Sequence, residues 1–200
     1  MRMFAFLPLL ALVLACGDEN PLQPNEELSI TPGALELTVA ASREGVKMVP
    51  FKGGGVWWSM LETLTEGEIA DCDAVGGVPD VGGGVLNITH LGRAEYRMLN
   101  CWDASFEFVI YETGTAVAAN GDQLSYYGSS DDGMLTGFDW LVPFEEGDYE
   151  IGPLSITGGT GRFVGATGSF ISSGYAVLGD AGWEGTEDWD GEISSVGSSK

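Results

Sequence analysis

From residue 46 onward, apolar residues occur in short or alternating runs that glycine and acidic residues separate. In residues 106–112, FEFVIYE, the side chains of Phe106, Phe108 and Ile110 fall on one face of an extended chain. This alternation predicts a strand whose Phe106 face packs on a core. No helix-length amphipathic segment with caps stands out, so the pattern predicts an all-β chain.

The clearest local signal is a hairpin. Residues 115–119 and 123–127 both favour extended structure, and Asn120-Gly121 supplies the positive-φ pair that a tight turn between antiparallel strands requires. Similar patterns predict further strands at 46–51, 56–64, 85–99, 135–142, 149–157, 169–178 and 190–196.

The strand at 85–99 is long enough to bend at Gly92, and Pro153 should interrupt its strand or place it at an edge. We expect turns at Gly147-Asp148 and Gly179-Asp180. Antiparallel strands joined by short turns remove their exposed edges most completely by closing into a barrel. The expected fold is therefore all-β, an antiparallel barrel of about eight strands.

The composition fits one domain with an acidic surface. Glycine accounts for 31 of 200 residues, which suggests many tight turns between short strands. Lys and Arg number 8 against 30 Asp and Glu, and a formal net charge of −22 argues against a nucleic-acid partner.

The N-terminus predicts export and a lipid anchor. Residues 1–15, MRMFAFLPLLALVLA, combine Arg2 with an apolar stretch too short to span a bilayer permanently, which is typical of a signal peptide. The sequence VLAC at 13–16 resembles the lipobox of bacterial lipoproteins, which implies cleavage before Cys16 and a diacylglycerol on its thiol. The alternative is an ordinary secretory signal with an incidental cysteine.

Residues 16–45 would then hold the lipidated cysteine and a linker, because 17–33 is polar and broken by proline. Residues 46–200 remain for the barrel domain. The expected location is the bacterial cell envelope, with the membrane contacted through the N-terminal lipid, and Gly17 mildly favours the outer membrane.

The two other cysteines, Cys72 and Cys101, lie in the exported part, where an oxidising compartment favours a disulfide between them. A reactive thiol or a metal pair is the alternative. With no CxxC spacing and one histidine in the chain, a zinc site is poorly supported.

Residues 156–168, ITGGTGRFVGATG, resemble a motif of bacterial members of the allene oxide cyclase barrel-like superfamily, relatives of plant dirigent proteins. Residues 49–53 (VPFKG), 88–93 (ITHLGR) and 118–124 (AANGDQL) resemble the same group in the same order. The resemblance implies an eight-stranded antiparallel barrel of the calycin or dirigent-like type. The superfamily includes an isomerising cyclase and proteins that steer radical coupling, but most relatives with this motif have no assigned activity, so no catalytic residue is implied.

Within this motif, glycines 158, 159, 161 and 165 are interpreted as turn residues, Arg162 as a polar arm and Phe163 as an apolar plug. An anion-cradling loop is the rival interpretation, but it needs a following helix and usually a lysine.

Candidate site residues are few. The six tryptophans could line a cavity, although core packing explains them as well. His90 would have to serve any Ser-His-Asp arrangement, but a structural or surface role is the simpler interpretation, and no nucleophile elbow occurs. Scarce arginines more often pair with carboxylates than bind anions. The weak ligand-binding candidates are Trp57, Trp58, His90, Arg93, Trp102 and Arg162.

The acidic run 180–192, DAGWEGTEDWDGE, could hold calcium, but it lacks EF-hand spacing, so a solvated acidic loop is favoured. We expect no metal and no cofactor. The leading hypothesis is a non-catalytic envelope barrel that binds a small apolar ligand or an envelope partner. The enzymatic alternative is a cofactor-free cyclase or isomerase, in which the barrel orients a flexible substrate. The oligomeric state is left open.

Overall fold

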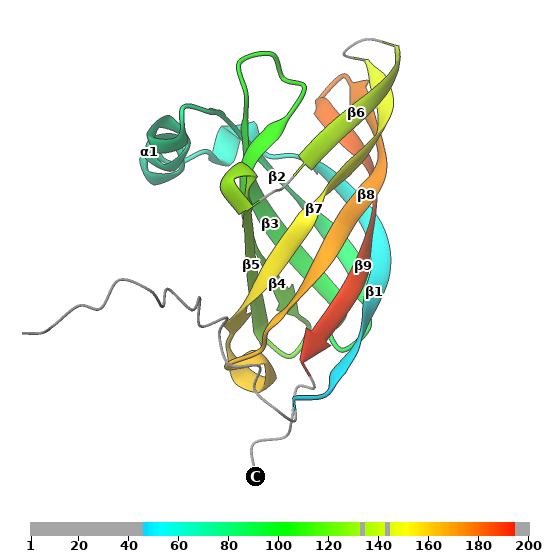
Figure 1. Cartoon of the computed structure of the whole chain (residues 1–200). Coiled ribbons are helices and arrows are strands. Elements are labelled where there is room, and N and C mark those ends of the chain that lie inside the picture. The colour runs from blue at the N-terminus through cyan, green and yellow to red at the C-terminus, as the bar shows by residue number, and fades with distance from the viewer. Residues whose placement is uncertain (1–45, 133–134, 143–144, 195–200) are drawn as a thin grey trace, which may run out of the picture. The chain divides into compact units, whose positions relative to one another are not determined.

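The computed structural model describes residues 46–132, 135–142 and 145–194. The predicted signal peptide, Cys16 and the linker lie outside these residues. The described chain forms a closed antiparallel β-barrel of eight strands, as predicted, with one further strand attached (Figure 1). The strands are β1 (Met48–Ser59), β2 (Val78–Ile88), β3 (Gly92–Trp102), β4 (Val109–Ala118), β5 (Gln123–Ser129), β6 (Leu135–Val142), β7 (Glu146–Gly159), β8 (Gly168–Gly179) and β9 (Gly182–Ser194).

The barrel closes because β7 pairs with two strands along the same edge. One half of β7 pairs with β5, from Leu124 opposite Gly159 to Tyr127 opposite Ser155. The other half pairs with β6, the attached strand. The ladder between β7 and β8 shifts register between Ile151 and Leu154, so Pro153 lies at an irregularity in the pairing, but β7 runs through it as one strand and is not interrupted as predicted.

Several predicted boundaries are wrong. The segments 46–51 and 56–64 are largely one strand, β1, and 85–99 is split between β2 and β3 by a turn in which His90 has a φ of 69°. Gly147-Asp148 lies inside β7 and is not a turn, because both residues pair with β6 and β8. The hairpin at Asn120-Gly121 is confirmed, but only Gly121 of the predicted positive-φ pair has a positive φ, at 87°.

The predicted core strand at 106–112 is also wrong at its start. Phe106 and Phe108 are exposed, and β4 begins only at Val109, which is buried in the barrel. The Asp103 carboxylate explains the difference, because its Oδ1 accepts hydrogen bonds from the backbone N–H groups of Glu107 and Phe108 at 3.0 Å each. This side chain folds the segment into a turn that alternation alone does not reveal.

Glycines were predicted to mark turns, but most glycines among the described residues lie within strands. Glycines 53–55 of β1 and 82–84 of β2 sit where the two strands pair. A Cβ on Gly84 would collide with the Val56 carbonyl and the Trp57 Cα, and one on Gly55 would collide with the Val85 carbonyl. The missing side chains therefore allow a close backbone approach. The strands are longer than the short strands expected from the glycine content: β1 has 12 residues and β7 has 14.

One helix was not predicted from the sequence. A short 3-10 turn (Leu61–Thr63) precedes α1 (Glu66–Val75), which begins at a capping box between Thr65 and Glu68 and ends at Gly76 in the left-handed conformation. Only Cys72 of α1 is buried, so the helix has no apolar periodicity to detect. Both of its caps are readable in the sequence.

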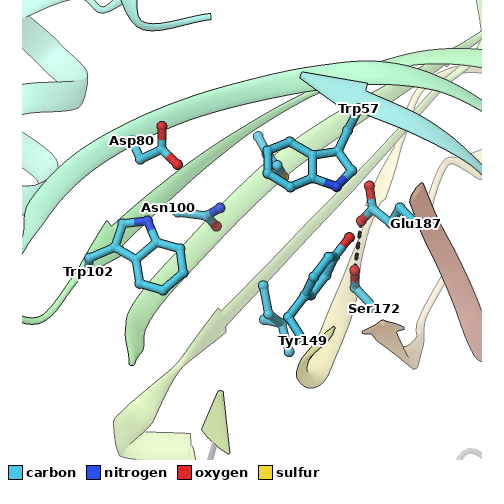
Figure 2. A pocket seen from close by; sticks show the side chains of 9 residues that line it. Trp57, Asp80, Asn100, Trp102, Tyr149, Ser172 and Glu187 are labelled. Carbon is cyan, nitrogen blue, oxygen red and sulfur yellow. Dashed lines mark hydrogen bonds between the residues drawn. The ribbon is translucent and has the colours of Figure 1, made fainter. Parts of the chain in front are cut away.

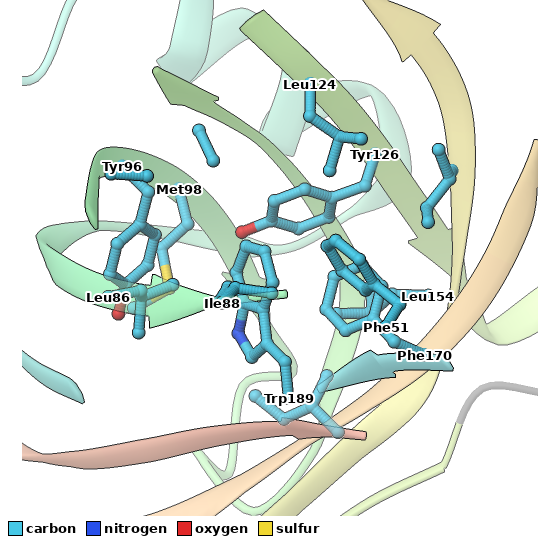
Figure 3. Packing of buried hydrophobic residues seen from close by; sticks show 14 of the residues in the cluster. Phe51, Leu86, Ile88, Tyr96, Met98, Leu124, Tyr126, Leu154, Phe170 and Trp189 are labelled. Atoms are coloured by element: carbon cyan, nitrogen blue, oxygen red, sulfur yellow. The ribbon is translucent and has the colours of Figure 1, made fainter. Parts of the chain in front are cut away.

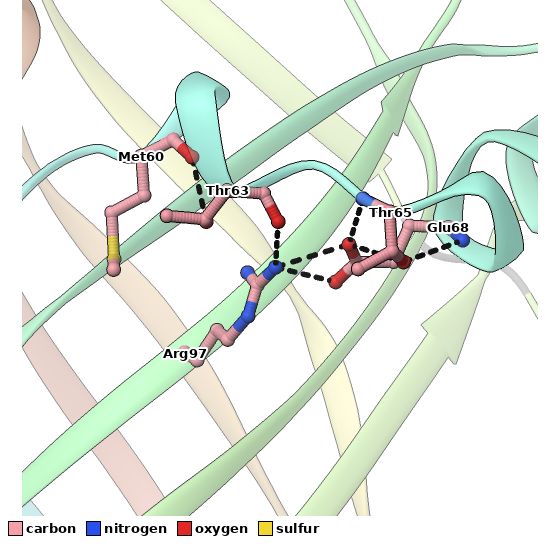
Figure 4. A network of polar contacts seen from close by, with 5 residues as sticks. All are labelled: Met60, Thr63, Thr65, Glu68 and Arg97. Carbon is pink, nitrogen blue, oxygen red and sulfur yellow. Dashed lines mark hydrogen bonds and ion pairs between the residues drawn. The ribbon is translucent and has the colours of Figure 1, made fainter.

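Two connections hold α1 against the outside of the barrel. The predicted disulfide between Cys72 and Cys101 is present, with the two Cα atoms 5.3 Å apart. Arg97 of β3 pairs with the Glu68 carboxylate at 2.8 Å and donates to the Thr63 carbonyl at 3.1 Å (Figure 4). A small cluster around Val81 and Leu99 is buried beneath the helix.

Aromatic rings fill the middle of the barrel (Figure 3). Phe170 stacks on Trp189 with the ring centroids 4.4 Å apart, and Tyr126 contacts both rings edge-on at 5.1 and 5.2 Å. Phe51 packs on the same rings. Fully buried Phe163 confirms the predicted plug. No helix among the described residues is long and apolar enough to cross a membrane.

Candidate functional site

A small cavity with a mostly apolar lining and a few polar groups lies inside the barrel, among residues of the half that carries α1 (Figure 2). Its open volume is about 20 Å³, which accommodates about one water molecule, and it is partly open to solvent. Side chains from β1, β2, β3, β7, β8 and β9 enclose it. They are Trp57, Asp80, Met98, Asn100, Trp102, Tyr149, Ile151, Ser172 and Glu187.

The two consecutive tryptophans of β1 point in opposite directions. Trp57 lines the cavity with 7% of its surface exposed, whereas Trp58 points outward and is 43% exposed. This follows from the two-residue repeat of a strand. The Tyr149 ring of β7 meets Trp57 edge-on at 6.1 Å, and the Tyr149 hydroxyl donates to the Thr186 carbonyl at 3.0 Å.

Glu187 of β9 is the most enclosed carboxyl of the cavity. Its Oε1 accepts hydrogen bonds from the Ser172 hydroxyl at 2.7 Å and from the Trp189 indole N–H at 2.6 Å. The Tyr96 hydroxyl donates to Oε2. Burial away from any cation raises the pKa of Glu187 to about 8, although the Trp189 hydrogen bond opposes this. Glu187 is therefore mostly protonated at neutral pH.

Asp80 and Asn100 add two more polar groups to the cavity wall. Burial raises the pKa of the Asp80 carboxyl, and a hydrogen bond from Trp102 opposes the increase. Asn100 is 3% exposed, and its Oδ1 has no hydrogen-bond partner. A buried acceptor without a partner costs free energy, so this amide is suited to a ligand or a water molecule.

Glu112 of β4 is a second fully buried carboxyl, outside the cavity lining. Burial raises its pKa to about 8, and the nearby Tyr126 hydroxyl lowers it slightly. Burial and the Glu112 charge raise the pKa of Tyr126 well above its usual range. Neither Glu112 Oε2 nor the Tyr126 hydroxyl reaches a partner in hydrogen-bonding geometry.

The structure brings together only two of the six predicted ligand-binding residues, Trp57 and Trp102. His90 is exposed in the turn between β2 and β3, and Arg93 is exposed at the start of β3. Arg162 lies beside the Phe163 plug, with its side chain 3.4 Å from the Asp122 carboxylate and donating to the Leu91 carbonyl. These polar contacts agree with the predicted polar arm.

Sequence reasoning missed Asp80, Asn100, Tyr149, Ser172 and Glu187. The acidic run 180–192 is not the predicted loop but mostly strand β9. Glu184, Asp188 and Asp190 are exposed, whereas Glu187 shares the inward face with Trp189 and Ile193. Trp189 and Ile193 stand two and six residues after Glu187, so the two-residue repeat of a strand puts all three on one face, and this was a readable signal.

Within the described ranges 46–132, 135–142 and 145–194, no three His, Cys, Asp or Glu side chains gather closely enough to hold a metal ion. Comparison with known proteins adds no identity. No protein-family model matches the chain, and no curated protein matches it in sequence. The chain is thus identified by its architecture alone, as an eight-stranded antiparallel β-barrel domain.

Proposed function

We propose that this chain is a lipid-anchored protein of the bacterial envelope whose barrel binds a small molecule at the α1 end. The observation that carries the binding role is the buried, unpartnered Asn100 Oδ1 in a cavity walled by Trp57 and Trp102. The anchor is inferred from residues 1–16 alone. The resemblance of residues 156–168 to the allene oxide cyclase barrel-like group agrees with this fold and supports a shared origin.

We infer a ligand with a polar head, in place of the small apolar ligand expected from the sequence. The rings of Phe51, Tyr126, Phe170 and Trp189 occupy the middle of the barrel, where an apolar ligand would have to lie. The remaining cavity is mostly apolar, with Met98, Ile151 and aromatic rings in its walls, but carboxyl, amide and hydroxyl groups also line it. Such a site selects a ligand with a polar head at its inner end.

Native mass spectrometry tests this proposal on the mature chain with Cys16→Ser, which prevents lipidation. After incubation with metabolite extract of the source cells, we expect a discrete added mass. Trp57→Leu should abolish it, whereas Trp58→Leu, the neighbouring indole on the outer face, should retain it. A bare protein mass in all three proteins would contradict the proposal, provided that circular dichroism shows each one folded.

One observation also favours the enzymatic alternative, a cofactor-free isomerase or cyclase. Glu187 lines the cavity with a pKa of about 8, close to the value that suits a general acid or base near neutral pH. The test is to recover the captured molecule and analyse it by chiral chromatography. Conversion that Glu187→Gln abolishes without loss of binding would support catalysis, and an unchanged molecule would leave binding as the function.

A further inference from the structure

The α1-end cavity holds two carboxyl groups and the unpartnered Asn100 Oδ1, together with one unpartnered donor, the Trp57 indole N–H. Asp80, Asn100 Oδ1 and Glu187 all face it, and none of its lining residues is Lys, Arg or His (Figure 2). The ion pairs formed among the described residues involve Asp190, Glu68 and Asp122, so neither Asp80 nor Glu187 has a cationic partner there. A ligand that donates hydrogen bonds and carries positive charge would complete this site.

The aromatic walls favour the same charge. Trp102 lies on one side of the cavity, while Trp57 and Tyr149 lie on the other (Figure 2). Indole and phenol faces carry the negative end of the ring quadrupole and therefore attract cations. An anionic head would meet these ring faces unfavourably.

The size of the cavity limits the head group. Its volume of about 20 Å³ holds a group as large as one water molecule, which an –NH3⁺ group matches and a trimethylated ammonium exceeds. An –NH3⁺ group has three N–H donors, and three acceptor residues line the cavity. The partly open side leaves room for the rest of the molecule.

We propose that the α1-end cavity binds the ammonium head of a primary amine, with Asp80, Asn100 and Glu187 accepting its hydrogen bonds between Trp57 and Trp102. This inference rests on the proposed binding function and names its ligand class. The three residues differ in how many hydrogen bonds they already accept. Asn100 Oδ1 is unpartnered, Asp80 accepts from Trp102, and Glu187 already accepts from three donors. Asp80 and Asn100 are therefore the residues whose substitution should weaken binding most.

The test is an NMR titration of the mature, unlipidated chain with four probes of similar length. They are butylammonium, butyltrimethylammonium, 1-butanol and butyrate. We expect butylammonium to shift the Trp57 and Trp102 indole signals and to bind roughly tenfold or more tightly than the other three. Because butyltrimethylammonium carries the same charge, it controls for loose attraction to the acidic surface.

Matched variants locate the binding site. Asp80→Asn and Asn100→Leu should each weaken butylammonium binding by roughly fivefold or more, whereas Glu150→Gln, an exposed carboxylate between Tyr149 and Ile151 on β7, should leave it unchanged. Equal shifts with both ammonium probes, or binding unaffected by Asp80→Asn and Asn100→Leu in folded protein, would overturn the amine inference. Binding of butanol or butyrate instead would overturn it while preserving a binding function. No perturbation by any probe would overturn the amine inference, and the separate mass-spectrometry test would then decide the binding function.

Discussion

At the scale of single residues, the decisive features are polar side chains that face inward. Trp57 and Trp102 were named from the sequence, because indoles stand out in any candidate cavity. Glu187 was not, since an acidic run is interpreted as solvated unless the strand register is known. Once β9 is placed beside β1 and β8, the two-residue repeat assigns Glu187 to the inside.

The first prediction concerns the buried carboxyls Glu112 and Glu187. Both have a folded-state pKa of about 8 against an ordinary value of 4.5, so the folded protein binds their protons more tightly than the unfolded chain does. These two carboxyls should therefore contribute most to the free energy of unfolding below about pH 4.5. Their contribution should fall as the pH rises to about 8. Each tenfold change in an acid constant corresponds to about 1.4 kcal/mol.

Urea unfolding of the chain between about pH 5 and pH 9 measures this dependence. Glu112→Gln and Glu187→Gln should each flatten it, because a neutral amide does not titrate. The exposed Glu150 provides the control, and Glu150→Gln should keep the wild-type slope. Identical slopes in all four proteins would show that the two buried carboxyls do not titrate as described.

The second prediction concerns glycine in a strand. Gly84→Ala places a Cβ against the Val56 carbonyl and the Trp57 Cα, and we expect a loss of roughly 2–3 kcal/mol in the free energy of unfolding. A Cβ on Gly67 of α1 would meet the Thr65 Oγ1 at 3.9 Å, an ordinary contact, so Gly67→Ala should leave stability unchanged or slightly increased. The denaturation midpoints of the two variants make the comparison. Equal midpoints would refute the close approach of β1 and β2.

At the scale of elements, strands with alternating patterns were predicted, whereas the helix α1 and the start of β4 were not. The strand β6 was predicted with its observed bounds, and β8 to within one residue at each end. The helix α1 was missed because only Cys72 on it is buried. The start of β4 was misplaced because the Asp103 side chain bends the preceding segment.

The third prediction concerns how α1 is attached. The Cys72–Cys101 disulfide spans a sequence separation of 29 residues, so its loss should lower the free energy of unfolding by about 3–4 kcal/mol. The double variant Cys72→Ser/Cys101→Ser and the wild-type chain in reductant should agree in their urea midpoints. A wild-type midpoint that reductant does not move, together with free thiols in a labelling assay, would show that the bond does not form.

At the scale of the whole molecule, the all-β class and barrel closure followed from the sequence, because short turns between antiparallel strands leave few other ways to remove edges. The sequence pattern did not predict which part of the barrel interior is filled and which part holds the cavity. Aromatic rings fill the middle, and polar groups line part of the cavity at the α1 end, because particular inward residues meet across the eight strands. Which residues meet depends on the register of the barrel.

The fourth prediction concerns the anchor, which rests on the sequence alone. Mass spectrometry of the membrane-extracted protein should find a diacylglycerol on Cys16 as the first residue of the mature chain. Cys16→Ser should release the protein into the aqueous phase on detergent partitioning. A mature chain that begins at another residue, or a Cys16 without lipid, would contradict the lipid anchor and favour ordinary secretion.

The central claim is that the α1 end of the barrel is a built site for a small polar head group. A crystal structure of the mature chain grown with butylammonium tests it most directly. We expect the amine nitrogen between Trp57 and Trp102, within hydrogen-bonding distance, about 3 Å, of Asn100 Oδ1. A cavity closed by its own side chains, with Asn100 Oδ1 bonded within the protein, would contradict the claim.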